Sequence, residues 1–121
     1  MDEKRFLKIK CAFEKNGGII VMSEDVDRHL DFVGADAATL NENIILIRSD
    51  RIPSASAIFE ELIHTAQYKS GKITGTNWNE LEIEAKEKLI KYQIQYKITD
   101  LENEITIKQI EELKLLMKEG K

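Results

Sequence analysis

The stretch Ser-Ala-Ile-Phe-Glu-Glu-Leu-Ile-His-Thr-Ala-Gln-Tyr-Lys-Ser-Gly, residues 56–71, decides how the rest of the chain is interpreted. At about 100° per residue, its pattern predicts a helix of about four turns. One side of this helix carries the apolar residues Phe59, Leu62 and Ala66. The other side carries Glu60, His64 and Gln67, and Glu61 lies one step round from Glu60. Two carboxylates and an imidazole within about one turn form the densest group of chemically active side chains in the sequence.

The five residues from Glu60 to His64 have the outline of the His-Glu-x-x-His motif of zinc hydrolases, with Glu in place of the first His. In that motif, two ligands one helical turn apart point at one ion, and the intervening Glu is the general base for water. We therefore expect Glu60 and His64 to bind a metal and Glu61 to act as the base. Glu with His is a harder ligand set than two imidazoles, so Mn²⁺ or Fe²⁺ is an alternative to Zn²⁺, and so is no metal.

A third ligand is expected on the following helix, which contains two suitable carboxylates. The spacing of thermolysin-like zinc hydrolases favours Glu84, whereas helical periodicity favours Glu82, which falls within the apolar arc beside Leu89. A buried carboxylate needs a partner or a cation, and both residues stay open as the third ligand. Gln67 and Tyr68, further along the central helix, are candidates for lining a substrate cleft.

The segment before the central helix predicts one helix and several short strands. A helix over Asp2–Lys15 stops at a glycine pair, and Ile19–Met22 and Ile44–Arg48 are short β-branched runs typical of strands. Between them we expect a helical turn over Asp25–Leu30 and an extended piece over Phe32–Gly34. Ser54 and Ser56 are the alternative N-caps of the central helix.

Two helices are expected after the central helix, each opened by a capping box. The first box starts at Asn77 and opens a helix over Asn79–Ile98. Its apolar residues mark two faces, which predicts a helix packed between other elements. The second box starts at Thr99 and opens a helix that runs to Lys118.

Strands early and helices late predict an α+β fold, with one domain over residues 1–121. We expect a small sheet of two to four short strands, an N-terminal helix, a central active-site-like helix and two long C-terminal helices.

Composition narrows the class of protein. The chain has 121 residues and a net charge of −4, so no basic field indicates binding to nucleic acid or to a membrane surface.

The single cysteine, Cys11, excludes an internal disulfide and is expected to be a small buried thiol. The charged first residues do not predict a signal peptide, and no apolar run approaches the roughly 20 residues of a membrane helix. We expect a cytoplasmic location on synthesis, with delivery as part of a larger secreted or phage protein if the domain acts elsewhere.

A family resemblance rests on Phe-Glu-Glu-Leu-Ile-His-Thr-Ala-Gln, residues 59–67. With the strand Ile44–Arg48 before it and Glu-Ile-Glu-Ala-Lys-Glu-Lys-Leu-Ile after it, this segment resembles zincin-like metallopeptidase domains. Such domains lie at the C-termini of bacterial polymorphic toxins and phage head-morphogenesis proteins. The similarity covers roughly residues 40–118. It implies a metal-dependent peptidase acting on a peptide or protein, as in a toxin effector domain, or an inactive descendant. It also implies that Ile44–Arg48 is an edge strand to which substrate adds.

The sequence leaves two other classes of protein open. A di-iron carboxylate bundle uses two Glu-x-x-His pairs, and Glu61 with His64 is the only such pair here, so a homodimer would be needed. A metal-free binding module is the stronger alternative. It would be an inactive zincin-like domain, an antitoxin-type or inhibitor protein, or a phage structural part that binds a cognate protein.

Overall fold

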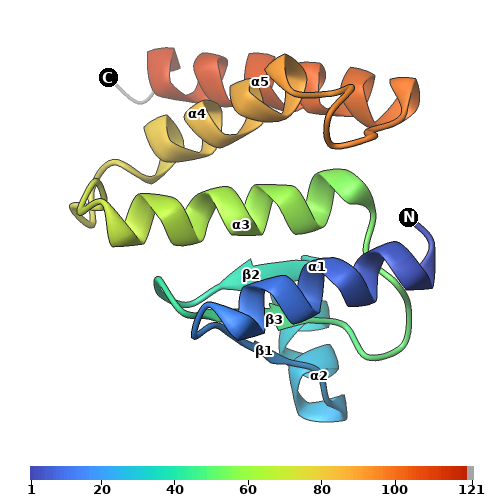
Figure 1. Cartoon of the computed structure of the whole chain (residues 1–121). Coiled ribbons are helices and arrows are strands. Elements are labelled where there is room, and N and C mark those ends of the chain that lie inside the picture. The colour runs from blue at the N-terminus through green and yellow to red at the C-terminus, as the bar shows by residue number, and fades with distance from the viewer. Residues whose placement is uncertain (120–121) are drawn as a thin grey trace.

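The computed structural model describes residues 1–119, which form five helices and a three-stranded sheet (Figure 1). In chain order these are α1 (Glu3–Lys15), β1 (Ile19–Val21), α2 (Glu24–Val33), β2 (Ala37–Thr39), β3 (Ile44–Ile47), α3 (Ala55–Lys69), α4 (Trp78–Lys91) and α5 (Asp100–Glu119). The α+β class, the central helix and the long C-terminal helices are as predicted. No helix in this described part combines the length and apolar character needed to cross a membrane.

The sheet has the order β1-β3-β2, so β3 is its central strand. β1 runs parallel to β3, pairing Ile20 with Ile45, and β2 runs antiparallel to it, pairing Ala38 with Leu46. The prediction that Ile44–Arg48 is an edge strand is therefore wrong. The edge strand beside α3 is β2. Its Ala-Ala-Thr sequence has no strand pattern, and pairing with β3 holds it extended.

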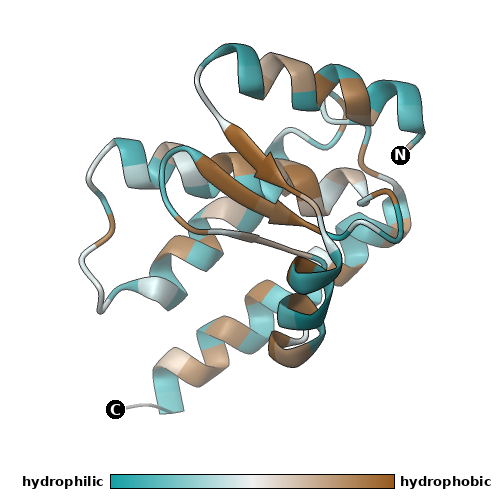
Figure 2. Ribbon diagram, turned by 90° about the horizontal axis from the view of Figure 1, so that it is seen from below, coloured by the Kyte–Doolittle hydropathy of each residue, from teal (hydrophilic) through white to brown (hydrophobic). Residues whose placement is uncertain are grey.

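The central strand is apolar at every position because both faces of the sheet are covered (Figure 2). Ile45 and Ile47 are fully buried on the face where α1 and α3 pack, with Phe6, Ile20 and Ile58. Leu46 points to the opposite face, where α2 packs through Val26 and Leu30. The helices thus lie on both sides of a small mixed sheet.

Helix α2 replaces two elements that the sequence predicted separately. The structure has one continuous helix through Phe32 and Val33, so the expected extended piece over Phe32–Gly34 is wrong. Ser23 caps its start, and Gly34 ends it in the left-handed conformation at φ 72°. The apolar Phe32 misled the prediction because it is 88% exposed and belongs to no core.

Helix α3 is enclosed between the sheet and α4 (Figure 1). Ser54 is its N-cap, accepting a hydrogen bond from the Ala57 N–H at 3.2 Å. Ile58 faces the sheet, while Ile63 packs against Ala85 and Leu89 of α4. Helix α4 itself packs on both α3 and α5, which confirms the expectation from its two apolar faces.

The boundaries of α4 differ from the prediction at both ends. Asn77 makes no side-chain capping hydrogen bond, because its Oδ1 accepts from the Thr74 N–H of the preceding loop at 3.0 Å. The helix ends at Lys91, well before Ile98, and residues 92–97 form turns with Lys97 at φ 53°. These turns bring Ile98 back into the core between α3 and α4, where it is buried.

The thiol of Cys11 is exposed, so its predicted burial is wrong. Helix α1 packs on the sheet through Phe6, Ile9 and Phe13. Cys11 is not among these packing residues.

The capping box at the start of α5 forms as predicted and also anchors α3. The Glu102 N–H donates to Thr99 Oγ1 at 3.1 Å, and the Thr99 N–H donates to Glu102 Oε2 at 3.0 Å. Glu102 Oε1 accepts hydrogen bonds from the N–H and the hydroxyl of Ser56, at 3.1 and 3.0 Å. One carboxylate therefore satisfies donors at the start of two helices.

Replacing Glu102 by Ala is expected to lower the free energy of unfolding by about 1–3 kcal/mol, because amide donors of both helices lose a charged acceptor. Urea unfolding followed by circular dichroism measures the change. Glu104→Ala, at an exposed carboxylate on the same helix, is the control and should cost less than about 0.5 kcal/mol. Equal losses in the two variants would contradict the role given to Glu102.

Candidate metal centre

The side of α3 that the sequence predicted to be polar is buried in the structure. Glu61, His64 and Gln67 are 7%, 5% and 2% exposed, whereas Ala66, assigned to the apolar side, is exposed. Packing of β2 and α4 against this helix covers these polar side chains. They must therefore find their partners inside the protein.

Two of these side chains, Glu61 and His64, form a cluster of possible metal ligands with Glu60. Ligand atoms of Glu60, Glu61 and His64 all lie within 4.8 Å of one another. Glu82 of α4 reaches the same place, with its Oε1 3.1 Å from His64 Nε2. The structure therefore joins an imidazole and carboxylates from two helices in a group that could hold a metal ion.

The orientation of the His64 ring is fixed by Gln67. The Gln67 amide nitrogen donates to the Leu81 carbonyl at 3.0 Å and to Glu84 Oε1 at 3.1 Å, both of which only accept. The Gln67 carbonyl oxygen therefore faces His64 Nδ1 at 2.7 Å and accepts its proton. Whenever His64 is neutral, its lone pair is on Nε2, the nitrogen that faces the carboxylates.

His64 Nε2 is buried and has no hydrogen-bond partner in the described residues. Glu82 Oε1 is close enough for an ion pair but does not lie in line with the ring N–H. An imidazole nitrogen that is buried beside a carboxylate without an aligned hydrogen bond is a candidate metal ligand. A divalent cation bound by imidazole and carboxylate fits this set of donor atoms.

Glu82 and Glu84 are equally exposed but make different contacts. Their side chains are 34% and 35% exposed, so burial does not distinguish them. Glu82 contacts His64 Nε2, whereas Glu84 contacts the Gln67 amide and, at 3.3 Å, the ammonium of Lys72. Glu82 thus adjoins the cluster at His64, and Glu84 lies behind Gln67 in the hydrogen-bond chain that orients His64.

Sequence reasoning missed Lys86, which reaches into the cluster from α4. Its side chain is only 11% exposed, and its ammonium forms an ion pair with Glu60 and lies 3.6 Å from Glu82 Oε2. Lysine is almost never fully buried unless it is paired. A signal was present, since Lys86 follows Glu82 by one turn and lies next to Ala85 in the apolar arc.

The environment shifts the proton affinities of the central residues. Burial raises the pKa of Glu61 to about 7, and the nearby His64 opposes this rise. Burial alone would lower the pKa of His64, but the Glu82 carboxylate and the Gln67 carbonyl favour its charged form and raise that pKa to about 9. Burial also works against the charged form of Glu82, but His64 and Lys86 outweigh it and lower its pKa.

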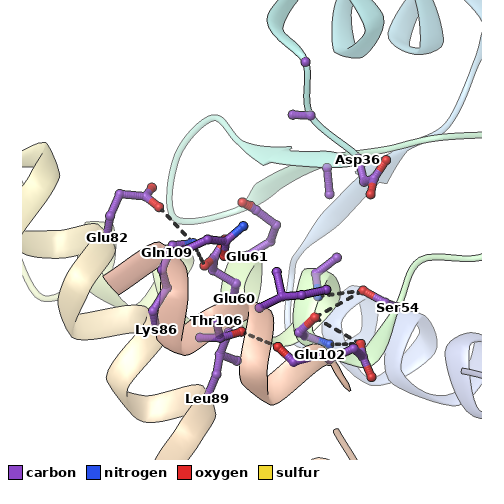
Figure 3. Close-up of a pocket in the computed structure, with 16 residues that line it drawn as sticks. Asp36, Ser54, Glu60, Glu61, Glu82, Lys86, Leu89, Glu102, Thr106 and Gln109 are labelled. Atoms are coloured by element: carbon purple, nitrogen blue, oxygen red, sulfur yellow. Dashed lines mark hydrogen bonds and ion pairs between the residues drawn. The ribbon is translucent and has the colours of Figure 1, made fainter. Parts of the chain in front are cut away.

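Two cavities meet at the cluster. The larger, of about 680 Å³, runs from Glu61 and Glu82 past Lys86 to the start of α3 and the inner side of α5 (Figure 3). The smaller, of about 230 Å³, extends the other way and is lined by β2 and by Tyr68 and Trp78. Both share Glu61 and Glu82 as lining residues. Tyr68 thus lines a cavity, whereas Gln67 is buried behind the cluster.

Comparisons with known proteins do not assign the chain to a family, because no family model, no curated protein and no solved structure matches it. The resemblance to zincin-like domains therefore rests on the motif alone. What the structure adds is a cluster of Glu60, Glu61 and His64 that is close enough to bind a metal.

The raised pKa values make the metal-free protein less stable as pH rises. A group whose folded-state pKa exceeds its unfolded value contributes stability that is lost as pH rises through the folded pKa. For Glu61 this window runs from its ordinary value of 4.5 to about 7, and for His64 from 6.5 to about 9. Each pKa unit corresponds to about 1.4 kcal/mol, so in EDTA the free energy of unfolding should fall from pH 5 to pH 9.

Urea unfolding at pH 5, 7 and 9 tests this expectation. Glu61→Gln should flatten the fall between pH 5 and 7, and His64→Asn should flatten it between pH 7 and 9. His29→Asn, at an exposed histidine of α2, is the control and should leave the slope unchanged. A slope that persists in both site variants would show that other groups control the pH dependence.

Proposed function

We propose that this chain is a metal-dependent peptidase domain of the zincin-like type, in which Glu60, His64 and Glu82 hold a divalent ion. The observation that carries the proposal is His64 Nε2, a buried nitrogen without an aligned hydrogen bond, which lies 3.1 Å from Glu82 Oε1 on a residue clustered with Glu60 and Glu61. Zn²⁺ is the first candidate ion, and Mn²⁺ or Fe²⁺ are alternatives because the donor set is rich in oxygen. When bound, the ion would polarise a peptide carbonyl and lower the pKa of a water molecule.

Glu61 is suited to take the proton from the attacking water. Its carboxylate lies beside the proposed ligands Glu60 and His64, so a water at the ion would be within its reach. It lines both cavities, and the hydroxyl of Thr39 on β2 contacts its carboxylate at 3.4 Å. In this proposal Gln67 and Glu84 touch no substrate and act by keeping the His64 ring in place.

The edge strand β2 supports a peptide as the substrate. β2 pairs with β3 on one side only, so an extended peptide can add to its other side as a further strand. The smaller cavity between β2 and α3 would receive a substrate side chain against Tyr68 and Trp78. Use of the domain as a toxin effector or within a phage protein belongs to the same proposal, as the family resemblance suggests.

A metal-free binding module is the second candidate function, and the ion pair between Lys86 and Glu60 favours it. With an ammonium against the carboxylates, the cluster has a counter-charge of its own. The same cavities would then receive part of a cognate protein, without chemistry.

Metal content separates these two functions. Protein purified without a histidine tag should contain near-stoichiometric zinc, manganese or iron by elemental analysis, or take it up when the ion is added. His64→Ala and Glu82→Gln should each reduce the bound metal to background, because each removes a proposed ligand. Glu80→Gln, at an exposed carboxylate of α4, should retain it. Absence of metal in every sample, even after addition of Zn²⁺ or Mn²⁺, would favour the binding module.

Glu61→Gln tests the proposed base independently of the metal. The variant should keep its bound metal and its fold but lose about 10²–10⁴-fold in peptide hydrolysis, the usual contribution of a general base. Cleavage of a peptide library, read by mass spectrometry, measures the loss. Full activity in the variant would rule out the proposed mechanism.

A further inference from the structure

Lys86 occupies an unusual place for a helical lysine. Lys86 as a whole is 8% exposed, and it lies between Ala85, which is fully buried, and Glu87, which is exposed. The side chain crosses from α4 to α3, where its ammonium pairs with Glu60 (Figure 3). On its own helix it faces Glu82, one turn earlier, at 3.6 Å.

The two carboxylates that Lys86 contacts are two of the three proposed metal ligands. Lys72 and Lys88 also pair with α4, but they contact Glu84 at 3.3 and 3.9 Å and are about half exposed. Among residues 1–119, Lys86 is therefore the lysine whose ammonium reaches the cluster itself. An ammonium between two carboxylates supplies part of the electrostatic stabilisation that a divalent cation would supply.

We propose that Lys86 is the resident counter-ion of this site and sets its affinity for a divalent metal by competing for Glu60 and Glu82. The inference rests on the proposed metal site and adds to it a residue that determines how tightly, and whether, an ion is held. Glu60 and Glu82 cannot both turn to a divalent ion while the ammonium stays between them, because the two cations repel each other.

The larger cavity gives the displaced side chain a place to go. Lys86 lines this cavity of about 680 Å³ together with Thr106 and Gln109 of α5, whose polar side chains offer oxygen acceptors (Figure 3). Lys86 can therefore leave the carboxylates by rotating its own side chain, without separating α3 from α4. Its stem is long and unbranched, which makes this rotation possible while the backbone stays fixed.

This arrangement also predicts that the protein keeps its fold with or without metal. Small structural zinc domains unfold without their ion because metal binding supplies most of their folding free energy. Here the ammonium of Lys86 stabilises the carboxylates in the metal-free state. The metal-free and metal-loaded proteins are then two folded states of one site, and Lys86 determines the balance between them.

The test compares Lys86→Met with Lys88→Met. Both variants remove one positive charge from α4 and keep an unbranched stem, but Lys88 is 45% exposed and pairs outside the cluster. Titration calorimetry with Zn²⁺, and the visible absorption of bound Co²⁺, give the affinity and the ligand environment. Lys86→Met should bind about tenfold more tightly than the wild type, and Lys88→Met within about twofold of it. Lys86→Arg, which keeps the charge, should show no gain.

Thermal unfolding adds a readout that does not depend on activity. In EDTA, Lys86→Met should melt at a lower temperature than the wild type, because Glu60 loses its partner, and Zn²⁺ should raise its melting temperature by more. If Lys86→Met does not fold in EDTA, Lys86→Gln, which can still hydrogen-bond to Glu60, takes its place in both measurements.

The outcomes separate this inference from the proposed function. Unchanged or weaker metal binding in Lys86→Met and Lys86→Gln, with binding lost in His64→Ala, would overturn the role of Lys86 and leave the metal site intact. Binding in the Lys86 variants but not in the wild type would confirm the competition and show that the natural chain favours its metal-free state. Failure of every variant to bind an ion would overturn both proposals.

Discussion

The enclosure of α3 between the sheet and α4 is the constraint on which the rest of the structure depends. Ile58 is buried against the sheet and Ile63 against α4, so the helix has little surface left for polar side chains. Glu61, His64 and Gln67 are nevertheless on it and are buried. Because burial of unpaired polar groups costs several kcal/mol, these side chains must be matched by groups on β2 and α4. The candidate site consists of these side chains together with the groups on β2 and α4 that they contact.

The buried polar side chains are paired in two ways, by hydrogen bonds and by opposite charge, and the two have different consequences. Gln67 is fully satisfied by His64, Leu81 and Glu84, so it makes this part of the site rigid. The carboxylates are matched by charge, through Lys86 and the ring of His64, and His64 Nε2 keeps no hydrogen bond. Charge matching is non-directional, and one cation can replace another. Rigid orientation of the imidazole beside exchangeable counter-charges is the arrangement expected of a site that takes up an ion.

Much of this could be predicted from sequence where the pattern is local. The central helix, the apolar strand ending at Ile47 and the box from Thr99 to Glu102 are short-range signals, and the structure has all three. Features that depend on strand pairing or on helix packing could not be predicted from local patterns. β2 is a strand only because β3 lies beside it, and that pairing makes β3 central instead of an edge. The position of Lys86 beside Ala85 in the apolar arc is a local signal, but its pairing with Glu60 depends on the packing of α4 against α3.

The choice between Glu82 and Glu84 shows why spacing along the chain was insufficient. Both carboxylates are about one-third exposed, and the angle at which α4 meets α3 decides that Glu82 faces His64 while Glu84 faces Gln67. The same angle determines the position of Lys86, which is one turn beyond Glu82 on the same face. In this crossing, the turn of α4 that presents Glu82 to His64 is followed by the turn that presents Lys86 to Glu60. The fold therefore brings Glu82 and Lys86 to the cluster together, and under the proposed function Glu82 would bind the ion while Lys86 would compete for the carboxylates.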